Sequence, residues 1–422
     1  MKPVAPIRSR PGRWWDAVVG AGPLIVGVAL ALYAAYRVLD PTPDKRLVIA
    51  TGPEQGAYAE FAERYRPLLA AHGITVELRA TQGSSENLAL LRDDASGVHA
   101  AFVQGGVDTP QCERPGILVS LGSVAYEPVW LFVREASVRQ RLGREPLTRL
   151  SQLAGWRINT GPDGSGAGPL FHRLAAANGL EATELTLGDK APVHGVVDLV
   201  QGRSDALLMV AAAEAPLVQY LLQTPGVVLM PFPQAEAYAR RFPFLRALVL
   251  PRGLIDLAAD RPPVDVPLVA ATASLVVRED LHPALVQLLV QAAQRAHGEA
   301  GWFNRAGEFP NPSASDLPLS PEAQRFYRNG LPWLQRYLPF WLANFIDRMW
   351  IVLLPLLAVM IPLSRVLPPL VELRVRSRVY RWYANLRAVE QALDDGGADP
   401  AALRRELEGI DAQVERIGLP LS

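Results

Sequence analysis

Three glycine-rich turns carry the residue types from which a small-molecule site is built. The longest, Asn159–Gly168, reads NTGPDGSGAG and joins a short apolar run to the start of a helical pattern. Two similar turns, Thr51–Tyr58 and Thr81–Asn87, occur earlier. A glycine-rich turn that opens a helix points several backbone N–H groups at one spot, which suits a carboxylate or phosphate oxygen. An ordinary strand-to-helix turn explains each one singly, but three such loops facing one cleft would make a binding site.

No motif for catalysis accompanies these turns. The chain has no G-x-S-x-G elbow, no H-E-x-x-H, no G-x-G-x-x-G after a strand and no P-loop lysine. Nothing in the sequence assigns a base to Ser165, and Glu54, Glu127 and Asp163 are scattered acids of the kind that is usually solvated. The six histidines lack metal-ligand spacing, and the single cysteine, Cys112, has no evident activating base. We therefore predict a binding protein rather than an enzyme, without cofactor or metal.

The bulk properties narrow the class of protein further. A length of 422 residues suggests two or three folding units. The 42 basic and 42 acidic residues balance, and no basic patch with interleaved aromatics is visible, so nucleic acid is not an expected partner.

The N-terminal region has the pattern of a membrane anchor. Residues 1–16 are basic, and from Ala17 to Tyr36 no residue carries a charge. About twenty such residues in a helix span roughly 30 Å, the thickness of a bilayer core. A cleaved signal peptide is the alternative, but no convincing small-x-small cleavage site follows. We expect a transmembrane helix at 17–39, with residues 1–16 in the cytoplasm by the positive-inside rule.

The central region alternates short apolar runs with helical patterns. This rhythm predicts a parallel or mixed sheet covered by helices. A proline- and arginine-rich break at Arg144–Arg149 suggests two α/β lobes, with ligand loops at the carboxyl ends of their strands. Within the second loop, Ser84 is a candidate cap for a helix beginning near Glu86. The expected strands are Leu47–Ala50, Ile74–Leu78, Ala100–Val103, Val129–Val133, Trp156–Asn159, Ala206–Val210, Val227–Met230 and Leu275–Val277.

Residues of about 45–310 resemble the TAXI-type solute-binding proteins of TRAP transporters. The order and spacing of several short pieces carry this resemblance, because each piece alone is weak. They are ATG at Ala50–Gly52 with Gly56 and Tyr58, ATQGSSENLALL at Ala80–Leu91, AFVQ at Ala101–Gln104, YEPVWLFVR at Tyr126–Arg134, the DGSG of the opening stretch, and QGRSDALL at Gln201–Leu208.

The resemblance implies an α/β periplasmic-binding-protein-like fold of type II. In that fold two lobes are joined by crossing strands, and a small anionic or zwitterionic ligand lies between them. Lobe 1 would comprise about 45–130 and 265–310, and lobe 2 about 131–264. A TRAP-type membrane permease would be the partner that receives the solute.

The sequence also departs from the family pattern. The first loop reads TGPEQGAYA, where relatives have a glycine-richer loop with two tyrosines, so Pro53 and Glu54 replace small residues. Ala167 stands where a hydroxyl is usual, and Gly105-Gly106 stands where an aspartate often follows the glutamine. A carboxylate at Glu54 would repel an anionic ligand if it faced the cleft. We therefore do not carry glutamate over as the ligand.

The C-terminal region predicts a second anchor. A juxtamembrane segment at 311–340 is proline- and serine-rich and then aromatic, which is typical of the headgroup level. We expect a transmembrane helix at 341–368, which Pro355 and Pro362 would kink. A re-entrant or interfacial segment is the alternative. The arginines that follow place residues 369–422 in the cytoplasm, since positive loops stay inside.

The tail at 369–422 predicts two amphipathic helices in a hairpin. Apolar residues recur every three or four positions on both sides of Asp394–Pro400, where Asp399 is a cap and Pro400 the first helical residue. Either the two helices pack on each other, or their seam recruits a partner or forms a homo-oligomer.

These observations combine into one hypothesis and one alternative. The hypothesis is a solute-binding protein anchored at both ends in the bacterial inner membrane, its lobes outside the cytoplasm, which captures a small polar, carboxylate-bearing solute for a TRAP-type permease. The alternative is a receptor or assembly protein that senses a ligand outside and signals through its tail. The expected ligand contacts are Thr51, Gln55, Tyr58, Gln82, Ser84, Asn87, Gln104, Glu127, Asp163, Ser165 and Gly166.

Overall fold

A computed structural model gives the fold of this chain. It describes residues 26–30, 32–34, 36–37, 43–54, 56–107, 117–313, 315–394, 401–402, 404–405 and 407–409. Residues Pro43–Tyr337 form one compact unit, and the segments on either side of it belong to a second one. Gln55 and Cys112 lie outside the described residues.

The first lobe of the compact unit is built on parallel strands. Strand β1 (Arg46–Ala50) lies between β2 (Thr75–Arg79) and β3 (Ala100–Gln104) and is parallel to both. All four residues from Leu47 to Ala50 are buried, because a central parallel strand is covered on both faces. Helices α2 (Ala57–Ala70), α3 (Ser84–Arg92) and α9 (Pro283–His297), with the short helix η1 (Asp94–Ser96), complete this part.

The second lobe is also built on a central strand with a parallel strand on each side. Strand β5 (Arg157–Asn159) is parallel to β6 (Thr186–Gly188) and to β7 (Ala206–Val210). Its core includes Trp130, Phe132, Trp156 and Phe171, each 1 % exposed or less. Its helices are α4 (Glu135–Leu142), α5 (Ala167–Ala177), α6 (Pro192–Val200), α7 (Pro216–Gln223) and α8 (Ala235–Arg241), with η2 (Leu150–Leu153) and η3 (Ala182–Glu184).

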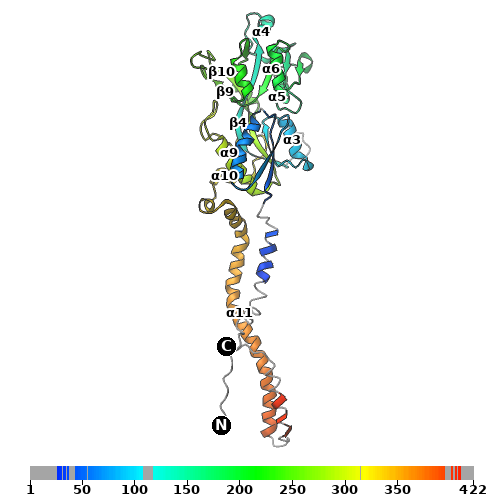
Figure 1. The fold of residues 1–422 in the computed structure, drawn as a ribbon, viewed down its shortest axis with the longest axis vertical. Coiled ribbons are helices and arrows are strands. Elements are labelled where there is room, and N and C mark those ends of the chain that lie inside the picture. Colours follow the sequence, from blue (N-terminus) through cyan, green and yellow to red (C-terminus); the bar gives the residue numbers. More distant parts are fainter. Residues whose placement is uncertain are drawn as a thin grey trace. The chain divides into compact units, whose positions relative to one another are not determined.

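Two long antiparallel strands connect the lobes (Figure 1). Strand β4 (Leu118–Arg134) pairs with β10 (Val266–Arg278) up to Pro128, and from Val129 onward with β7. Strand β10 pairs with β9 (Leu245–Leu250) at its start and with β3 at its end. Strand β8 (Val227–Leu229) also pairs with β4. The sequence predicted only short pieces of β4 and β10, because Gly122, Pro128 and Pro267 interrupt their apolar runs.

The segment expected to lie beside the membrane is largely part of the first lobe. Asn311 and Leu319 form bridges with Ser123 and Ser120, and α10 (Pro321–Asn329) packs on α9. The Tyr327 hydroxyl donates a hydrogen bond to the Leu121 carbonyl oxygen at 2.7 Å. Residues 311–329 of the segment expected at 311–340 therefore pack on the first lobe, and the position of this segment beside a membrane stays a prediction. Some aromatic residues of this segment, such as Phe326, are buried in the first lobe. Trp333 in η4 (Trp333–Arg336) is instead 69 % exposed.

The flanking segments are helical where they are described. Helix α11 (Phe340–Asp394) runs without interruption through both the expected second anchor and the first half of the expected hairpin. In the described part of the chain no single helix has the length and apolarity needed to cross a bilayer. Phe340–Trp350 and Leu354–Pro362 meet those criteria together, as a pair bent by 60°. The bend precedes Pro355, whose ring opposes a straight helix at that turn.

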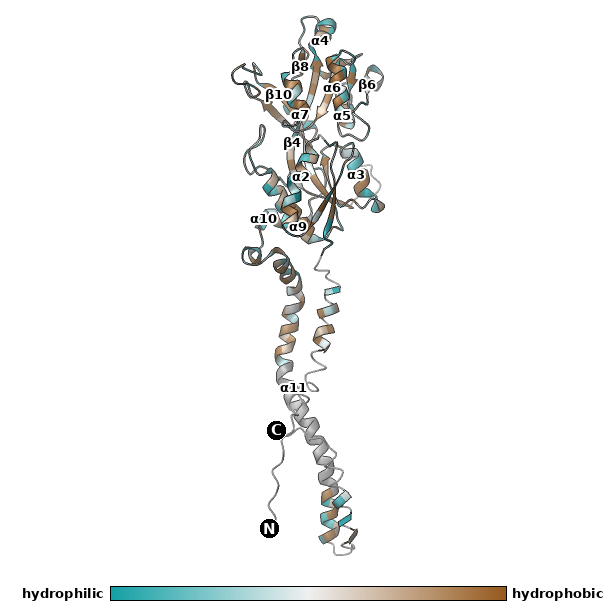
Figure 2. Cartoon of the chain, in the orientation of Figure 1, coloured by the Kyte–Doolittle hydropathy of each residue, from teal (hydrophilic) through white to brown (hydrophobic). Residues whose placement is uncertain are grey.

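Part of the expected first anchor, 17–39, lies outside the described residues, and Val26–Leu30 within it is helical. The hairpin turn at 395–400 and residues 410–422 also lie outside them. Figure 2 shows the hydropathy that distinguishes the strands, which are mostly hydrophobic, from α4, which is largely hydrophilic.

Candidate functional site

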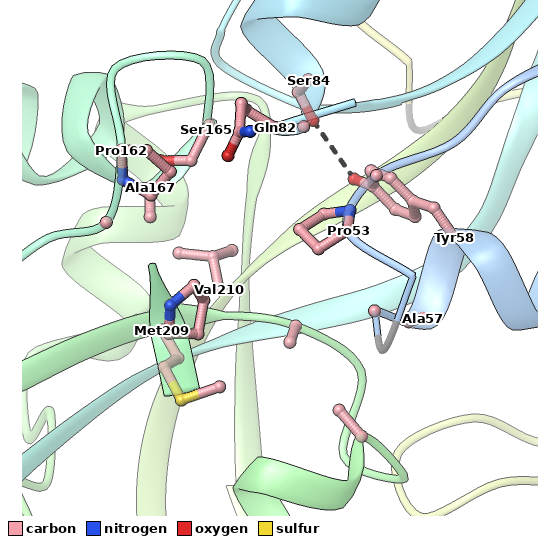
Figure 3. Close-up of a pocket in the computed structure, with 18 of the residues that line it drawn as sticks. Pro53, Ala57, Tyr58, Gln82, Ser84, Pro162, Ser165, Ala167, Met209 and Val210 are labelled. Atoms are coloured by element: carbon pink, nitrogen blue, oxygen red, sulfur yellow. Dashed lines mark hydrogen bonds between the residues drawn. The ribbon is translucent and has the colours of Figure 1, made fainter. Parts of the chain in front are cut away.

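A cavity of about 410 Å³ lies between the two lobes. The first lobe contributes the loops before α2 and α3, the end of β3 and Glu127 within β4. The second contributes the loops before α5, α6 and α7 and the end of β7. Figure 3 shows Tyr58, Ser84 and Pro53 on one side of this cavity, with Met209 and Val210 across it. The three glycine-rich turns of the sequence therefore do face one cleft.

Most of the expected contact residues line this cavity, and a few do not. The lining includes Tyr58, Gln82, Ser84, Gln104, Glu127, Ser165 and Gly166. Thr51 and Asn87 lie outside the lining and are buried, whereas Asp163 lies outside it and is exposed. Gln55 falls outside the described residues. Contact with a ligand stays a prediction for the residues that line the cavity, and we no longer expect it of Thr51, Asn87 and Asp163.

A buried polar cluster occupies the first-lobe side. The Tyr58 hydroxyl donates a hydrogen bond to Glu127 Oε2 at 2.8 Å and lies 3.4 Å from the Ser84 hydroxyl. Glu127 is only 3 % exposed, and burial raises its pKa to about 8 although the Tyr58 hydrogen bond acts to lower it. Burial also raises the pKa of Tyr58, and the Glu127 charge adds to that shift. At neutral pH the cluster is therefore uncharged, with a carboxylic acid beside the cavity.

Ser84 does not cap its helix as the sequence suggested. Helix α3 begins at Ser84 itself, and the preceding Gly83 offers no side chain to the first N–H groups. The Ser84 hydroxyl instead accepts a hydrogen bond from the Gln104 backbone N–H at 2.9 Å. Ser84 thereby fixes the end of β3 against the start of α3, and its side chain stays at the cavity wall.

Thr51 and Asn87 hold the loops rather than line the cavity. The Asn87 side-chain amide donates hydrogen bonds to the carbonyl oxygens of Thr51 and Phe102, the latter at 2.8 Å. Its Oδ1 accepts from the Thr81 hydroxyl at 2.7 Å. One fully buried side chain therefore ties the ends of β1 and β3 to the loop before α3, which sets the shape of the first-lobe wall.

Glycines in the opening stretch allow the two lobes to meet. A Cβ added to Gly164 would lie 2.5 Å from Gln82 Cβ, and one added to Gly166 would lie 2.7 Å from Gln104 Oε1. Hydrogen bonds cross at the same place: Ser85 Oγ donates to the Ser165 carbonyl at 3.0 Å, and Gln104 Nε2 donates to the Gly166 carbonyl at 3.2 Å. The cleft is thus closed on this side, and close approach of the lobes requires glycine here.

Sequence reasoning missed the apolar wall of the second lobe. Its residues are Val193, Leu208, Met209, Val210 and Leu217. The position of Met209 and Val210 at the carboxyl end of a parallel strand was the available signal, because ligands bind at those ends in such sheets.

The QGRSDALL motif has a structural role. Asp205, 4 % exposed, accepts hydrogen bonds from the Arg157 backbone N–H, the Arg157 guanidinium and the Ser137 hydroxyl. Burial acts to raise the pKa of this carboxyl, but these donors hold it well below its usual range. Asp205 therefore joins β5, β7 and α4 in the core of the second lobe and does not line the cavity, whereas Leu208 at the end of the motif does.

No group of three or more histidine, cysteine, aspartate or glutamate side chains suited to a metal ion occurs among the described residues. Neither lysine, arginine nor histidine is among the described residues that line the cavity. Of the described lining residues, the only acids are Glu54, which is exposed, and Glu127.

Comparison with known proteins identifies a family for most of the compact unit. Residues 49–329 match the NMT1-like family. This match agrees with the two-lobed periplasmic-binding-protein fold and supports the binding of small molecules. It does not name the TAXI family, so that finer assignment stays a prediction. No curated protein matches the chain closely enough to count as a relative.

Several solved structures have a distant likeness to the chain. The periplasmic aliphatic sulphonate binding protein SsuA from Escherichia coli is 14% identical, with 75% of this chain and 84% of that one covered and a TM-score of 0.39. A protein from Bordetella bronchiseptica RB50 is 14% identical, with 72% and 89% covered and a TM-score of 0.44. The effector-binding domain of QuiR in complex with shikimate is 11% identical, with 61% and 98% covered and a TM-score of 0.39. Values this low say nothing of the ligand of this chain.

Proposed function

The chain belongs to the NMT1-like family, and from that premise we propose that it captures a small carboxylate-bearing solute outside the cytoplasm and delivers it to a transporter. The cavity is the observation that carries this proposal. It is of the size at which proteins bind small organic molecules, and loops from both lobes line it. A solute that contacts both lobes stabilises the closed form over the open one, which gives the transporter a loaded shape to recognise.

The proposal includes the way the protein is held. We propose anchors near both ends in a bacterial inner membrane, both termini in the cytoplasm, and a TRAP-type permease as the partner that moves the solute. The uncharged stretch at 17–36, the bent apolar pair within α11 and the basic residues beside each support this arrangement. We assign the chain no catalytic activity, since no nucleophile with a partnering base lines the cavity among the described residues.

Thermal melting of the purified full-length chain in detergent tests the binding step. A panel of amino acids, keto acids, monocarboxylates and dicarboxylates would be added one by one. A ligand at a hundred times its Kd stabilises the folded state by roughly 2.7 kcal/mol, so the Tm rises by a few degrees. If no member of a broad panel moves the Tm, solute capture is refuted.

A receptor that signals through its tail is the second candidate. Helix α11 favours it, because one helical element, bent by 60° before Pro355, runs from the segment after the compact unit into the tail. Co-purification separates the two functions. A multi-span permease recovered with the full-length chain supports transport, whereas a soluble cytoplasmic partner that depends on residues 369–422 supports signalling.

A further inference from the structure

Helix N-termini converge on the cavity. Within the described residues five helices of eight or more residues begin at its wall: α2, α3, α5, α6 and α7. In each the residue before the helix has no side chain that caps it; these residues are Gly56, Gly83, Gly166, Ala191 and Ala215. The Glu86 N–H in the first turn of α3 donates to the Gly164 carbonyl oxygen at 3.3 Å. The other N–H groups of these first turns and the aligned peptide dipoles make the potential there positive, which favours an anion.

The charges around the cavity suit a ligand with a single negative charge. The described lining contains no cationic side chain that could pair with a second one. Glu54 is exposed to water, which weakens its repulsion of a ligand. Glu86 lies at the start of α3, where its carboxylate accepts a hydrogen bond from the Gln82 backbone N–H at 2.7 Å.

Glu127 is the buried polar group best placed to meet the ligand. Tyr58 of α2 occupies its Oε2, which leaves Oε1 for a molecule in the cavity. Among the described residues, Ala271 on β10 is its register partner, and Ser84 of α3 and Gln104 of β3 line the same cavity; all three side chains are neutral. Since burial keeps a proton on Glu127 at neutral pH, Oε1 can donate a hydrogen bond to a carboxylate oxygen.

The opposite wall selects the rest of the ligand. Leu208 and Met209 are 3 % and 7 % exposed, and Val193, Val210 and Leu217 extend the same apolar surface. A second carboxylate or a row of hydroxyls against this wall would lose its water without gaining a partner, which is unfavourable. A hydrocarbon group loses nothing there and gains the hydrophobic contribution.

We propose that the cavity takes a monocarboxylate anion with a compact apolar body. Its carboxylate faces the helix N-termini and shares the proton of Glu127, and its hydrocarbon part lies against the wall formed by Leu208, Met209 and Val210. The assignment rests on the proposed function, because it names the class of solute that the cleft captures.

The pH dependence of binding has a definite sign under this proposal. An anion needs Glu127 protonated, so the affinity is constant below the pKa and falls about tenfold per pH unit above it. With the value of about 8, the Kd at pH 9.5 would be about thirtyfold weaker than at pH 6.5. A ligand that pairs an ammonium group with ionised Glu127 would show the opposite sign.

Calorimetric titration of the full-length chain in detergent tests the proposal. The probes are isovalerate and phenylacetate, with glutarate as the dicarboxylate and leucine as the zwitterion, each at pH 6.5, 8 and 9.5. We expect the two monocarboxylates to bind at least tenfold more tightly than glutarate and leucine, with the loss at high pH given above. Glu127→Gln keeps an N–H donor but cannot ionise, so the ratio of its Kd values at pH 9.5 and 6.5 should be near one. Asp163→Asn, which removes an exposed acid outside the lining, should keep the wild-type ratio.

Two results would overturn the assignment while leaving solute capture intact. One is glutarate or leucine binding as tightly as the monocarboxylates. The other is an affinity for the monocarboxylates that does not weaken between pH 6.5 and 9.5 in the wild-type chain. If none of the four probes bound at any pH, that result would count against solute capture itself. The monocarboxylate assignment, which rests on solute capture, would then be refuted as well.

Discussion

At the scale of single residues, the polar side chains near the cleft have two different roles. Some hold its loops in place, and others line the cavity. Asn87 has an accessible surface of 0 % and satisfies three partners in two loops and a strand, yet it does not line the cavity. Glu127 has one hydrogen-bond partner, Tyr58, in the described part of the chain and does line the cavity. A polar side chain on an element that borders the cleft is therefore not by itself evidence of ligand contact.

Replacing Asn87 tests the shaping role. Asn87→Ala would leave the Thr51 and Phe102 carbonyl oxygens and the Thr81 hydroxyl without this partner. Each buried group left unsatisfied costs about 1–3 kcal/mol, so we expect a loss of about 3 kcal/mol in the free energy of unfolding, with allowance for partial relaxation. Urea unfolding followed by fluorescence would measure it. Gln82→Ala, at an exposed lining position, is the control and should change stability by less than about 0.5 kcal/mol.

The sequence predicted which loops meet but could not separate these two roles. The turns at residues 51–58, 81–87 and 159–168 were expected to face one cleft, because the carboxyl ends of parallel strands share an edge. Whether a side chain at such an edge turns inward or outward depends on backbone angles that residue types do not determine. Thr51 and Asn87 turn toward the protein, and Glu127 shares its buried cluster with the cavity.

At the scale of elements, the helix starts and the crossing strands determine what the cleft can do. The short strands and most helices were predictable, since apolar runs and helical spacing are local signals. The packing of residues 311–329 against β4 was not, because an aromatic cluster before an apolar helix has the same composition as a membrane-interface segment. The apolar wall was not predictable from motifs, because Leu208, Met209 and Val210 have the same residue types as an ordinary buried strand.

The glycines of Asn159–Gly168 also allow the two lobes to approach closely, a role that the sequence of this segment alone does not reveal. Gly164 was expected to expose backbone N–H groups, and its position shows a further requirement, which is space for Gln82 of the other lobe. Gly164→Val should hold the lobes apart and lower the affinity for a bound solute more than tenfold. The Tm without ligand should change little, because the clash is between lobes rather than inside one.

A matched control lies four residues away. A Cβ on Gly168 would meet only Thr160 Oγ1, at 3.9 Å, and alanine favours the helix α5 in which it lies. Gly168→Ala should therefore retain ligand binding and melt at the same temperature or slightly higher. Titration of both variants with the same solute would decide the matter, and equal affinities for the two would contradict a steric role for Gly164.

At the scale of the whole molecule, two buried titratable groups tie stability to pH in opposite directions. Glu127 has a folded pKa of about 8, above its unfolded value, so its contribution to stability is complete at low pH and is lost as the pH rises toward 8. His297 lies at the end of α9, 8 % exposed, with its Nε2 buried and unpartnered among the described residues. Burial, and then the nearby Arg64, lower its pKa to about 3.

The sign for His297 follows from proton binding. Between pH 6.5 and 3 the unfolded chain binds a proton on this histidine and the folded chain does not, so stability falls as the pH falls. The slope is about 1.4 kcal/mol per pH unit. His297→Phe should keep the edge-to-face packing on Phe61, now at a 4.7 Å ring separation, and cannot bind a proton. Relative to the wild type, this variant should therefore gain about 2 kcal/mol in the free energy of unfolding between pH 7 and pH 5.

Urea unfolding of the full-length chain at pH 7, 6 and 5 would measure this difference. The comparison between variant and wild type cancels the contribution of Glu127, which both chains share. His172→Gln, which removes an exposed imidazole on α5, serves as the control and should leave the pH dependence of the wild type unchanged. A constant difference between His297→Phe and the wild type across this range would mean that the imidazole reaches solvent or a partner in the folded state. The buried side of the α2–α9 contact would then be open enough to let a proton reach His297.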